Sequence, residues 1–304
     1  GFGFGSFTFG NIACQIVGYY LIALILVPLG YAHLTLRPWL RPLSLALLWT
    51  WTVLGVPLSL AFLFALFSAK ELSLYLAVLV AAATAVAYPT VPGLLVRFYR
   101  SHAVRTALEQ RGSGRSWLEE IPVPVLVTAI LGAFYGVVLN LLVLFNGLFP
   151  LWGTWATGLR GVALNDAAAI SLIIIVWGLL ARRRCAWWSA LILFGGLSSS
   201  WVFTLARTPW PKLLDTLDFP AFEREMMLNV PLQGSHLAVL VGVPLLLTLV
   251  AILRARGPMM GSALTPIERG QPLRAKRALA SEGTQAGVRP AADAGGFRDT
   301  GRPS

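Results

Sequence analysis

The sequence predicts an all-α fold, a polytopic transmembrane helix bundle with seven spanning helices. Of its 304 residues, 57% are hydrophobic and 12% are charged, and the mean hydropathy is +0.72. Soluble domains carry about 25% charged residues. Seven apolar stretches each have about the 20 residues that a helix needs to cross a bilayer. Lysine and arginine also sort to alternate loops between these stretches, as they do in multi-pass membrane proteins.

The predicted spans are separated by short polar segments. A four-residue break at 68–71 divides the second span from the third. The fifth span has 18 residues, so we expect its outer end to extend into the preceding loop. In order, the spans are residues 13–35, 43–67, 72–96, 122–145, 164–181, 186–206 and 235–254. Proline removes a backbone hydrogen bond and should kink several of these helices, at Pro28, Pro57, Pro89, Pro92 and Pro244.

The distribution of positive charge predicts the orientation. Nineteen of the 24 Lys and Arg residues fall in alternate loops and in the C-terminal segment, and five fall in the loops of the other side. Loops rich in Lys and Arg stay on the cytoplasmic side of a membrane. We therefore expect a bacterial-type cytoplasmic membrane, with the N-terminus outside and the C-terminus in the cytoplasm.

Residues 1–12 are predicted to form an outer N-terminal segment, and 13–254 the transmembrane domain. Within that domain, the cytoplasmic connection 97–121 is long enough to hold structure of its own. Its first half has the pattern of an interfacial helix, in which Val104 and Leu108 would face lipid.

The outer connection 207–234 is predicted to cap the bundle. Pro211 suits the first turn of a helix, and Leu213, Leu214 and Leu217 would then share one face. A helix with one apolar face can lie on the outer ends of the spans.

The C-terminal segment 255–304 is rich in Pro, Gly, Ala and Arg and has no apolar periodicity, which predicts a disordered basic tail. The net charge of +11 does not indicate nucleic-acid binding, because the cations flank the spans or lie in this tail. Such cations contact anionic lipid headgroups. The expected partners are therefore membrane lipids, with anionic headgroups bound through the tail, and no nucleic acid.

Ionisable groups inside a bilayer are costly and mark functional sites. In this sequence Asp166, His33 and His236 come nearest, and all three map to span ends. This pattern disfavours a proton-coupled pump. The sequence also places no set of metal-binding side chains at one depth of the membrane, so we expect no metal. No lysine lies inside a span, where retinal would need one, so we expect no cofactor.

Neutral polar groups gather at the predicted outer ends of the fourth to seventh spans. If these spans pack together, the groups line an outward-facing cavity, with Asn140, Asn146, Asp166, Ser199 and His236 as candidate ligand-binding residues. The alternative, which we favour, is structural. Asn165 and Asp166 stand where the fifth helix would need an N-cap, and Ser235 where the seventh would.

Ser199 and Ser200 together with His236 raise the hypothesis of a catalytic Ser–His dyad. No G-x-S-x-G motif surrounds the serines, and a serine without a placed base is only a small hydroxyl. Small residues also let helices approach closely. We interpret four glycines as helix-packing positions, namely Gly132, Gly136, Gly195 and Gly196.

The leading hypothesis is a non-enzymatic accessory or scaffold subunit that binds partner membrane subunits through its helix faces, its outer cap and its tail. The lack of charge within the spans and the small-residue faces favour it. One alternative is a permease for a lipid or a small neutral solute, which would use the outer cavity and the kinked helices. The other is an outer-leaflet intramembrane hydrolase. Unrelated proteins share such topologies, so the fold alone does not choose among the three.

Overall fold

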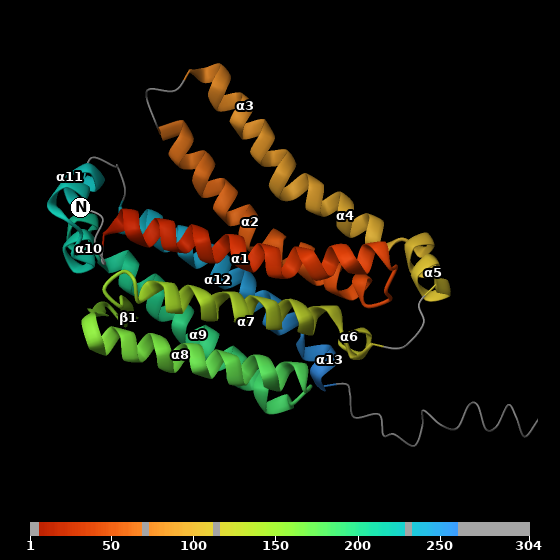
Figure 1. The fold of residues 1–304 in the computed structure, drawn as a ribbon. Helices are drawn as coiled ribbons and strands as arrows, with labels where there is room; N and C mark the ends of the chain where they lie inside the picture. The colour runs from red at the N-terminus through yellow and green to blue at the C-terminus, as the bar shows by residue number, and fades with distance from the viewer. Residues whose placement is uncertain (1–5, 69–72, 112–115, 229–232, 261–304) are drawn as a thin grey trace, which may run out of the picture. The chain divides into compact units, whose positions relative to one another are not determined.

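The computed structural model describes residues 6–68, 73–111, 116–228 and 233–260, which form an all-α bundle (Figure 1). Within these residues, seven helical spans are long and apolar enough to cross a membrane, which confirms the predicted fold class. They are α1 (Phe7–Leu34), α2 (Leu40–Ser68), the run of α3 (Leu74–Ala85), η1 (Val86–Thr90) and α4 (Val91–Arg100), α7 (Val123–Leu142), α8 (Gly158–Leu180), α9 (Arg184–Arg207) and α12 (Gly234–Arg254).

The remaining elements are short. They are α5 (His102–Arg111), α6 (Trp117–Glu120), α10 (Trp210–Leu217), α11 (Ala221–Leu228), α13 (Arg256–Met260) and the antiparallel strands β1 (Phe149–Leu151) and β2 (Thr154–Ala156). The predicted break between the second and third spans, from residue 69 on, lies outside the described residues. The predicted tail begins differently than expected, because its residues 256–260 form α13 and Met259 is buried. The rest of the tail, after residue 260, lies outside the described residues.

The core lies among α7, α8, α9 and α12. α7 packs along α8 and α9 packs along α12, while α2 covers part of α7 and α12. Leu131, Leu172, Trp187 and Ile252 are each no more than 1% exposed in this core. Lipid tails are as apolar as leucine, so such helices associate through close packing and interhelical hydrogen bonds.

Two of these hydrogen bonds attach α12. The Tyr135 hydroxyl of α7 lies 3.1 Å from Thr248 Oγ1 of α12. Trp187 Nε1 of α9 donates to the Ile252 carbonyl oxygen at 2.7 Å. They fix α12 against α7 and α9.

The four predicted packing glycines differ in their surroundings. A Cβ atom at Gly132 of α7 would stand 2.8 Å from Val176 Cγ2 of α8, so this glycine lets the two helices approach closely. Gly136 is also buried, but a Cβ there would meet no neighbouring atom within 4 Å. The space beside Gly195 and Gly196 is likewise open.

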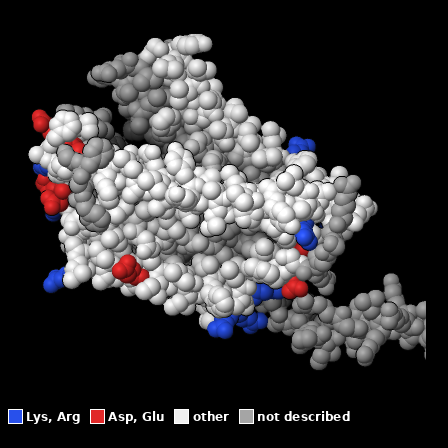
Figure 2. All heavy atoms as spheres, in the orientation of Figure 1, with Lys and Arg blue, Asp and Glu red and all other residues white. Residues whose placement is uncertain are grey.

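The two ends of the bundle hold different elements (Figure 1). The hairpin end holds the start of α1, the β1–β2 hairpin, α10 and α11, and the arginine end holds α5, α6, the α8–α9 turn and α13. Figure 2 shows that the charged side chains of one face gather near these ends and leave a band between them that is mostly uncharged. The apolar spans and this band are those of a multi-pass membrane protein. Its orientation across the membrane stays a prediction.

The fifth predicted span begins well before its apolar run. α8 starts at Gly158 with Thr157 in the N-cap position, which confirms the expected extension into the loop. The N-cap assignment of Asn165 and Asp166 is therefore wrong, because both lie about two turns inside the helix. α12 also begins before Ser235, so that residue is not its N-cap.

The third span contains the π-helical turn η1 around Pro89. Proline lacks the N–H group that a regular helix needs at this position. Tyr88, from the same turn, stacks on Trp51 of α2 with 5.6 Å between ring centroids. A Cβ atom at Gly55 would stand 2.7 Å from Tyr88 Cδ1, so Gly55 makes room for this contact between α2 and η1.

The prediction that Val104 and Leu108 face lipid is wrong. Leu108 of α5 is 5% exposed and lies in a cluster with Ala32 of α1 and Leu40 of α2, and Val104 packs against the same cluster. Either lipid or protein can cover the apolar face of a helix. Here the ends of α1 and α2 cover it.

The prediction for α10 is confirmed. Pro211 lies in its first turn, and Leu213 is buried in a cluster with Leu205 of α9 and Ala238 of α12. Leu214 is also buried, and Leu217 packs against the cluster. α10 therefore covers the ends of α9 and α12.

Candidate functional site

A row of hydroxyl groups on α9 and its C-cap residue holds the β1–β2 hairpin. Ser200, Thr204 and Thr208 recur at four-residue spacing, lie on one helix face and are each at most 6% exposed. Ser200 Oγ donates to the Pro150 carbonyl oxygen at 2.8 Å and accepts from the Trp152 N–H at 3.1 Å. The hydroxyl of this candidate catalytic serine therefore bonds to the backbone of the hairpin.

The next two hydroxyls continue the row. The Gly153 N–H donates to Thr204 Oγ1 at 2.9 Å, and Trp155 Nε1 donates to Thr208 Oγ1 at 2.9 Å. Trp152 and Gly153 have φ of 45° and 101°, the positive values that a two-residue hairpin turn requires. Non-helical backbone needs protein partners wherever water is excluded. The hydroxyl row supplies such partners for this turn.

Asn165 attaches the loop before the hairpin to α8. It is 0% exposed, and its Nδ2 donates to the Gly161 carbonyl oxygen at 3.0 Å and to the Leu148 carbonyl oxygen at 3.3 Å. A Cβ atom at Gly161 would collide with the carbonyl oxygen of Gly147, so the loop backbone lies directly on the helix. Within the described residues, Asn165 Oδ1 has no hydrogen-bond partner. Asn165 is thus a buried anchor for the loop.

A buried carboxylate joins α11 to the start of α1. Glu223 is 7% exposed. Its Oε2 accepts from the Phe7 N–H at 2.6 Å, and its Oε1 accepts from the Thr8 N–H at 3.2 Å and the Thr8 hydroxyl at 2.6 Å. The side chain of Ser6, the N-cap of α1, accepts from the Phe9 N–H at 3.1 Å. Glu223 therefore completes the capping of a helix that lies more than 200 residues away in the chain.

The pKa of the Glu223 carboxyl is lowered from its ordinary value of 4.5. Burial raises this pKa, but hydrogen bonds from the Thr8 side chain and from the N–H groups of Phe7 and Thr8 stabilise the charged form and outweigh burial. A pKa lowered by folding stabilises the folded state above pH 4.5, and this contribution is lost as the pH falls through the lowered pKa.

Aromatic contacts reinforce the same junction. The ring centroids of Phe7 and Phe219 are 5.9 Å apart, and those of Phe145 and Phe219 are 6.4 Å apart. Phe145 also covers Gly10, where a Cβ atom would stand 2.7 Å from the ring Cε1. The start of α1 therefore contacts both the α10–α11 segment and the loop that follows α7.

The middle of α1 contrasts with its two ends. The buried residues of this helix are Gly10 and Ala32, near its two ends. All seven residues over 22–28 are exposed. At the arginine end, a hydrogen bond between His33 Nε2 and the Tyr99 hydroxyl joins α1 to α4. α1 is thus attached at both ends, and its middle is exposed.

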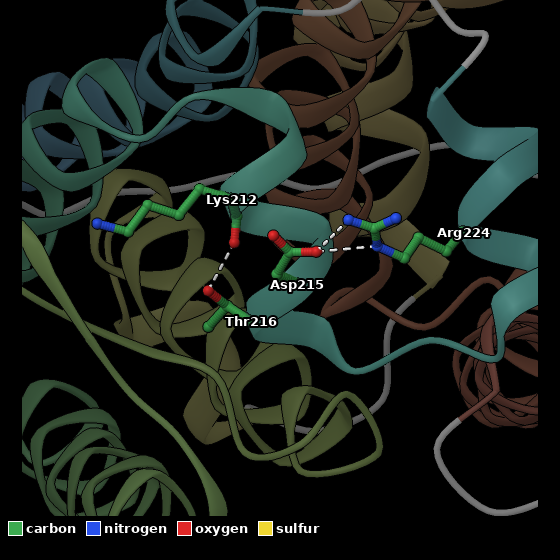
Figure 3. Close-up of polar contacts among 4 residues, drawn as sticks. All are labelled: Lys212, Asp215, Thr216 and Arg224. Carbon is green, nitrogen blue, oxygen red and sulfur yellow. Dashed lines mark hydrogen bonds and ion pairs between the residues drawn. The ribbon is translucent and has the colours of Figure 1, made fainter.

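A surface ion pair joins α10 to α11 (Figure 3). Arg224 Nε donates to Asp215 Oδ1 at 2.8 Å, and Arg224 Nη2 contacts the same oxygen. These side chains are 40% and 57% exposed, so the pair adds little stability. The Thr216 hydroxyl donates to the Lys212 carbonyl oxygen at 2.8 Å, and the Lys212 side chain points away from the ion pair. Asn146, a candidate ligand residue, donates to the Thr216 carbonyl oxygen at 3.3 Å and so ties α10 to the loop after α7.

The other candidate site residues lie on four helices. Asn140 of α7 and Ser199 of α9 are exposed, and each donates at 2.7 Å to a backbone carbonyl one turn earlier in its own helix. Asp166 is exposed on α8, and His236 is partly buried in the first turn of α12. In the part of the chain that the structure describes, no group of three or more His, Cys, Asp and Glu side chains could hold a metal ion.

The site that emerges is the hairpin-end cap, made of the β1–β2 hairpin, α10 and α11. Sequence reasoning missed both of its main attachments. The four-residue spacing of hydroxyls from Ser200 to Thr208 is visible in the sequence and could have indicated the first. No local pattern marks Glu223, because its partners lie at the other end of the chain.

Comparisons of the chain with known protein families, curated proteins and solved structures found no match.

Proposed function

We propose that the protein is a non-enzymatic accessory or scaffold subunit of a membrane complex, and that the middle of α1 packs against a transmembrane helix of a partner subunit. One observation carries this proposal. The seven consecutive exposed residues over 22–28 make nearly two helical turns, so no face of α1 is covered there.

The other spans bury more of their surface. In its most apolar stretch, α7 buries 50% of its residues and α8 buries 39%. The corresponding stretch of α1 buries 0%, and that of the Tyr75–Arg100 run buries 6%. A helix at the edge of a bundle normally buries one side against it. One face of α1 is partly buried over 13–21, whereas no residue over 22–28 is, so a partner helix can contact α1 in that exposed stretch.

The exposed surface of α1 has the composition that helix association in lipid requires. Its large side chains include Ile22, Leu24 and Leu26, which are 50%, 70% and 57% exposed. Gly18 and Gly30 have open space beside them, so the backbone of another helix can approach closely. These features support a transmembrane partner rather than a soluble one.

Two further observations support the non-enzymatic role and the location. The hydroxyls of Ser199 and Ser200 already donate to backbone carbonyls. The concentration of arginine at one end of the bundle supports an orientation with that end in the cytoplasm, as in a bacterial-type cytoplasmic membrane.

Photo-crosslinking in the native membrane tests the proposal. A photoreactive amino acid would replace Leu24 of α1, which is 70% exposed, or Ile173 of α8, which is 66% exposed and serves as the matched control. The proposal predicts a discrete cross-linked protein from position 24 and lipid adducts alone from position 173. Lipid adducts alone at both positions would contradict it and would favour the permease alternative.

A further inference from the structure

Arginines from two segments that are far apart in the sequence meet at the arginine end. Arg184 Nη2 donates to the Met260 carbonyl oxygen at 3.3 Å, and α13 packs on α9. Figure 2 shows Lys or Arg atoms gathered over the α8–α9 turn and over α13. We call this surface the arginine patch, formed by Arg182, Arg183 and Arg184 of the turn and by Arg254 and Arg256 at the junction of α12 and α13.

Most of the positive charge of the patch is exposed to solvent. Four of its members are exposed and form no ion pair within the described residues, namely Arg183, Arg184, Arg254 and Arg256. α6 lies at the same end of the bundle (Figure 1), and its acids Glu119 and Glu120 are also exposed. These four exposed arginines therefore leave a net positive surface that can attract an anion.

Local structure does not explain arginine at the turn. Arg182 has φ of 57°, in the left-handed region where a helix usually ends on Gly or Asn. Arg183 occupies the N-cap position of α9 without a side-chain cap, and Arg184 is the first helical residue. Positive charge is unfavourable at the N-terminus of a helix. The same arginines directly follow the C-terminus of α8, where positive charge is favourable, so the two helix ends offset each other and the turn itself does not require three arginines.

Exposed indole rings place the patch at the level of lipid headgroups. Trp177 of α8 is 72% exposed, and Trp188 of α9 is 51% exposed. Each lies one to two turns from the arginines of the turn, toward the apolar band. Tryptophan is enriched at the membrane–water interface, where phosphate groups also lie.

We propose that the arginine patch binds the phosphate of an anionic phospholipid from the surrounding membrane. The planar guanidinium group forms paired hydrogen bonds with phosphate oxygens. Arginines contributed by two segments can reach more than one phosphate, so a diphosphatidyl lipid should bind more tightly than phosphatidylglycerol. This proposal does not depend on the accessory-subunit proposal and concerns a surface other than the C-terminal tail.

The test uses the full-length protein in detergent, titrated with phosphatidylglycerol and separately with phosphatidylcholine while native mass spectrometry counts bound lipids. The double variant Arg183→Gln/Arg256→Gln removes two charges from the patch. Arg97→Gln/Arg100→Gln, on the exposed last turn of α4, removes two charges from the same end and is the matched control. Both variants keep the tail, so its contribution cancels.

Each cation near an anionic membrane surface contributes about fivefold in affinity, so the patch variant should bind phosphatidylglycerol about 25-fold more weakly. The α4 control should change by less than about twofold, because its charges do not contact the bound lipid. The double variant Arg183→Lys/Arg256→Lys keeps both charges but loses the paired hydrogen bonds, so its affinity should lie between those of the wild type and the Gln variant. Such partial binding would exclude misfolding as the cause of the loss. Equal losses in patch and control variants would overturn the proposal. Competition by inorganic phosphate at equal concentration would overturn a lipid ligand in favour of a soluble one.

Discussion

Replacing Glu223 by Gln should release the first turn of α1 from α11. The amide has nearly the same size as the carboxylate, but it carries no charge and presents an NH₂ group where one oxygen now accepts. That NH₂ group would face an N–H of α1, either of Phe7 or of Thr8. The substitution therefore removes at least one hydrogen bond and weakens the others without creating a cavity.

The expected loss follows from the three hydrogen bonds that Glu223 accepts. A hydrogen bond to a charged group contributes about 1.5–3 kcal/mol net, and loss of an N-cap typically costs about 1 kcal/mol. Gln can keep one oxygen as an acceptor, so we expect a loss of about 2 kcal/mol. A loss of this size raises the equilibrium constant for local opening of α1 about 30-fold over that of the wild type.

Hydrogen–deuterium exchange in detergent at pH 7 measures this opening directly. Amides in the first turns of α1 should exchange about 30-fold faster in the Glu223→Gln variant, while amides in α7 keep their protection. The matched control is Asp215→Asn, which makes the same charge change in the exposed pair of Figure 3 and should alter exchange by less than about twofold. Unchanged protection of α1 in Glu223→Gln, or an equal effect of Asp215→Asn, would refute the reasoning.

The same contact predicts a pH dependence. After correction for intrinsic exchange rates, wild-type α1 should lose protection as the pH falls below 4.5, because protonation of Glu223 removes the charge that its hydrogen bonds stabilise. The Glu223→Gln variant should show no such transition between neutral and acidic pH. A transition of the same size in both proteins would assign it to other groups.

Three further substitutions test the packing, each by thermal unfolding in detergent. Trp187→Phe removes the hydrogen bond to the Ile252 carbonyl and should cost about 1 kcal/mol, and no change in stability would contradict its role between α9 and α12. Gly55→Leu would collide with Tyr88 and should cost about 1–3 kcal/mol through separation of α2 from η1. Thr204→Val keeps the side-chain shape but leaves the Gly153 N–H of the hairpin without its acceptor. This should cost about 1–3 kcal/mol of stability and loosen the hairpin. Ser199→Ala is the exposed control on the same helix.

The spans could be predicted because length and hydropathy decide whether a helix can cross a membrane. The sequence also predicts α10, since Pro211 and the leucine spacing are local signals. The sequence-based predictions are wrong where the same local pattern is compatible with two different surroundings of a residue. Leu108 has the same pattern whether lipid or the end of α1 covers it. Asn165 precedes an apolar run, as an N-cap does, yet the helix begins earlier, at Gly158.

The attachments of the cap could not be predicted, because they depend on distant partners. Glu223 is one of several acids in its segment, and nothing in that segment distinguishes it from its exposed neighbour Glu225. Glu223 caps α1 because the folded chain brings the start of α1 next to it, and the local sequence does not contain that information. The hydroxyls at Ser200 and Thr204 also appear as ordinary small residues of a span until the hairpin turn is placed against them.

The most direct test of the central claim, that this chain is an accessory subunit with a partner helix on α1, is native mass spectrometry after gentle extraction from its own membrane. The proposal predicts a complex of defined stoichiometry that contains a second membrane protein. That complex should dissociate when Leu24 is replaced by Trp, a bulky side chain on the exposed middle of α1, and should persist when Ile173 is replaced by Trp. A monodisperse single chain with no second protein, obtained under the mildest extraction, would contradict the claim.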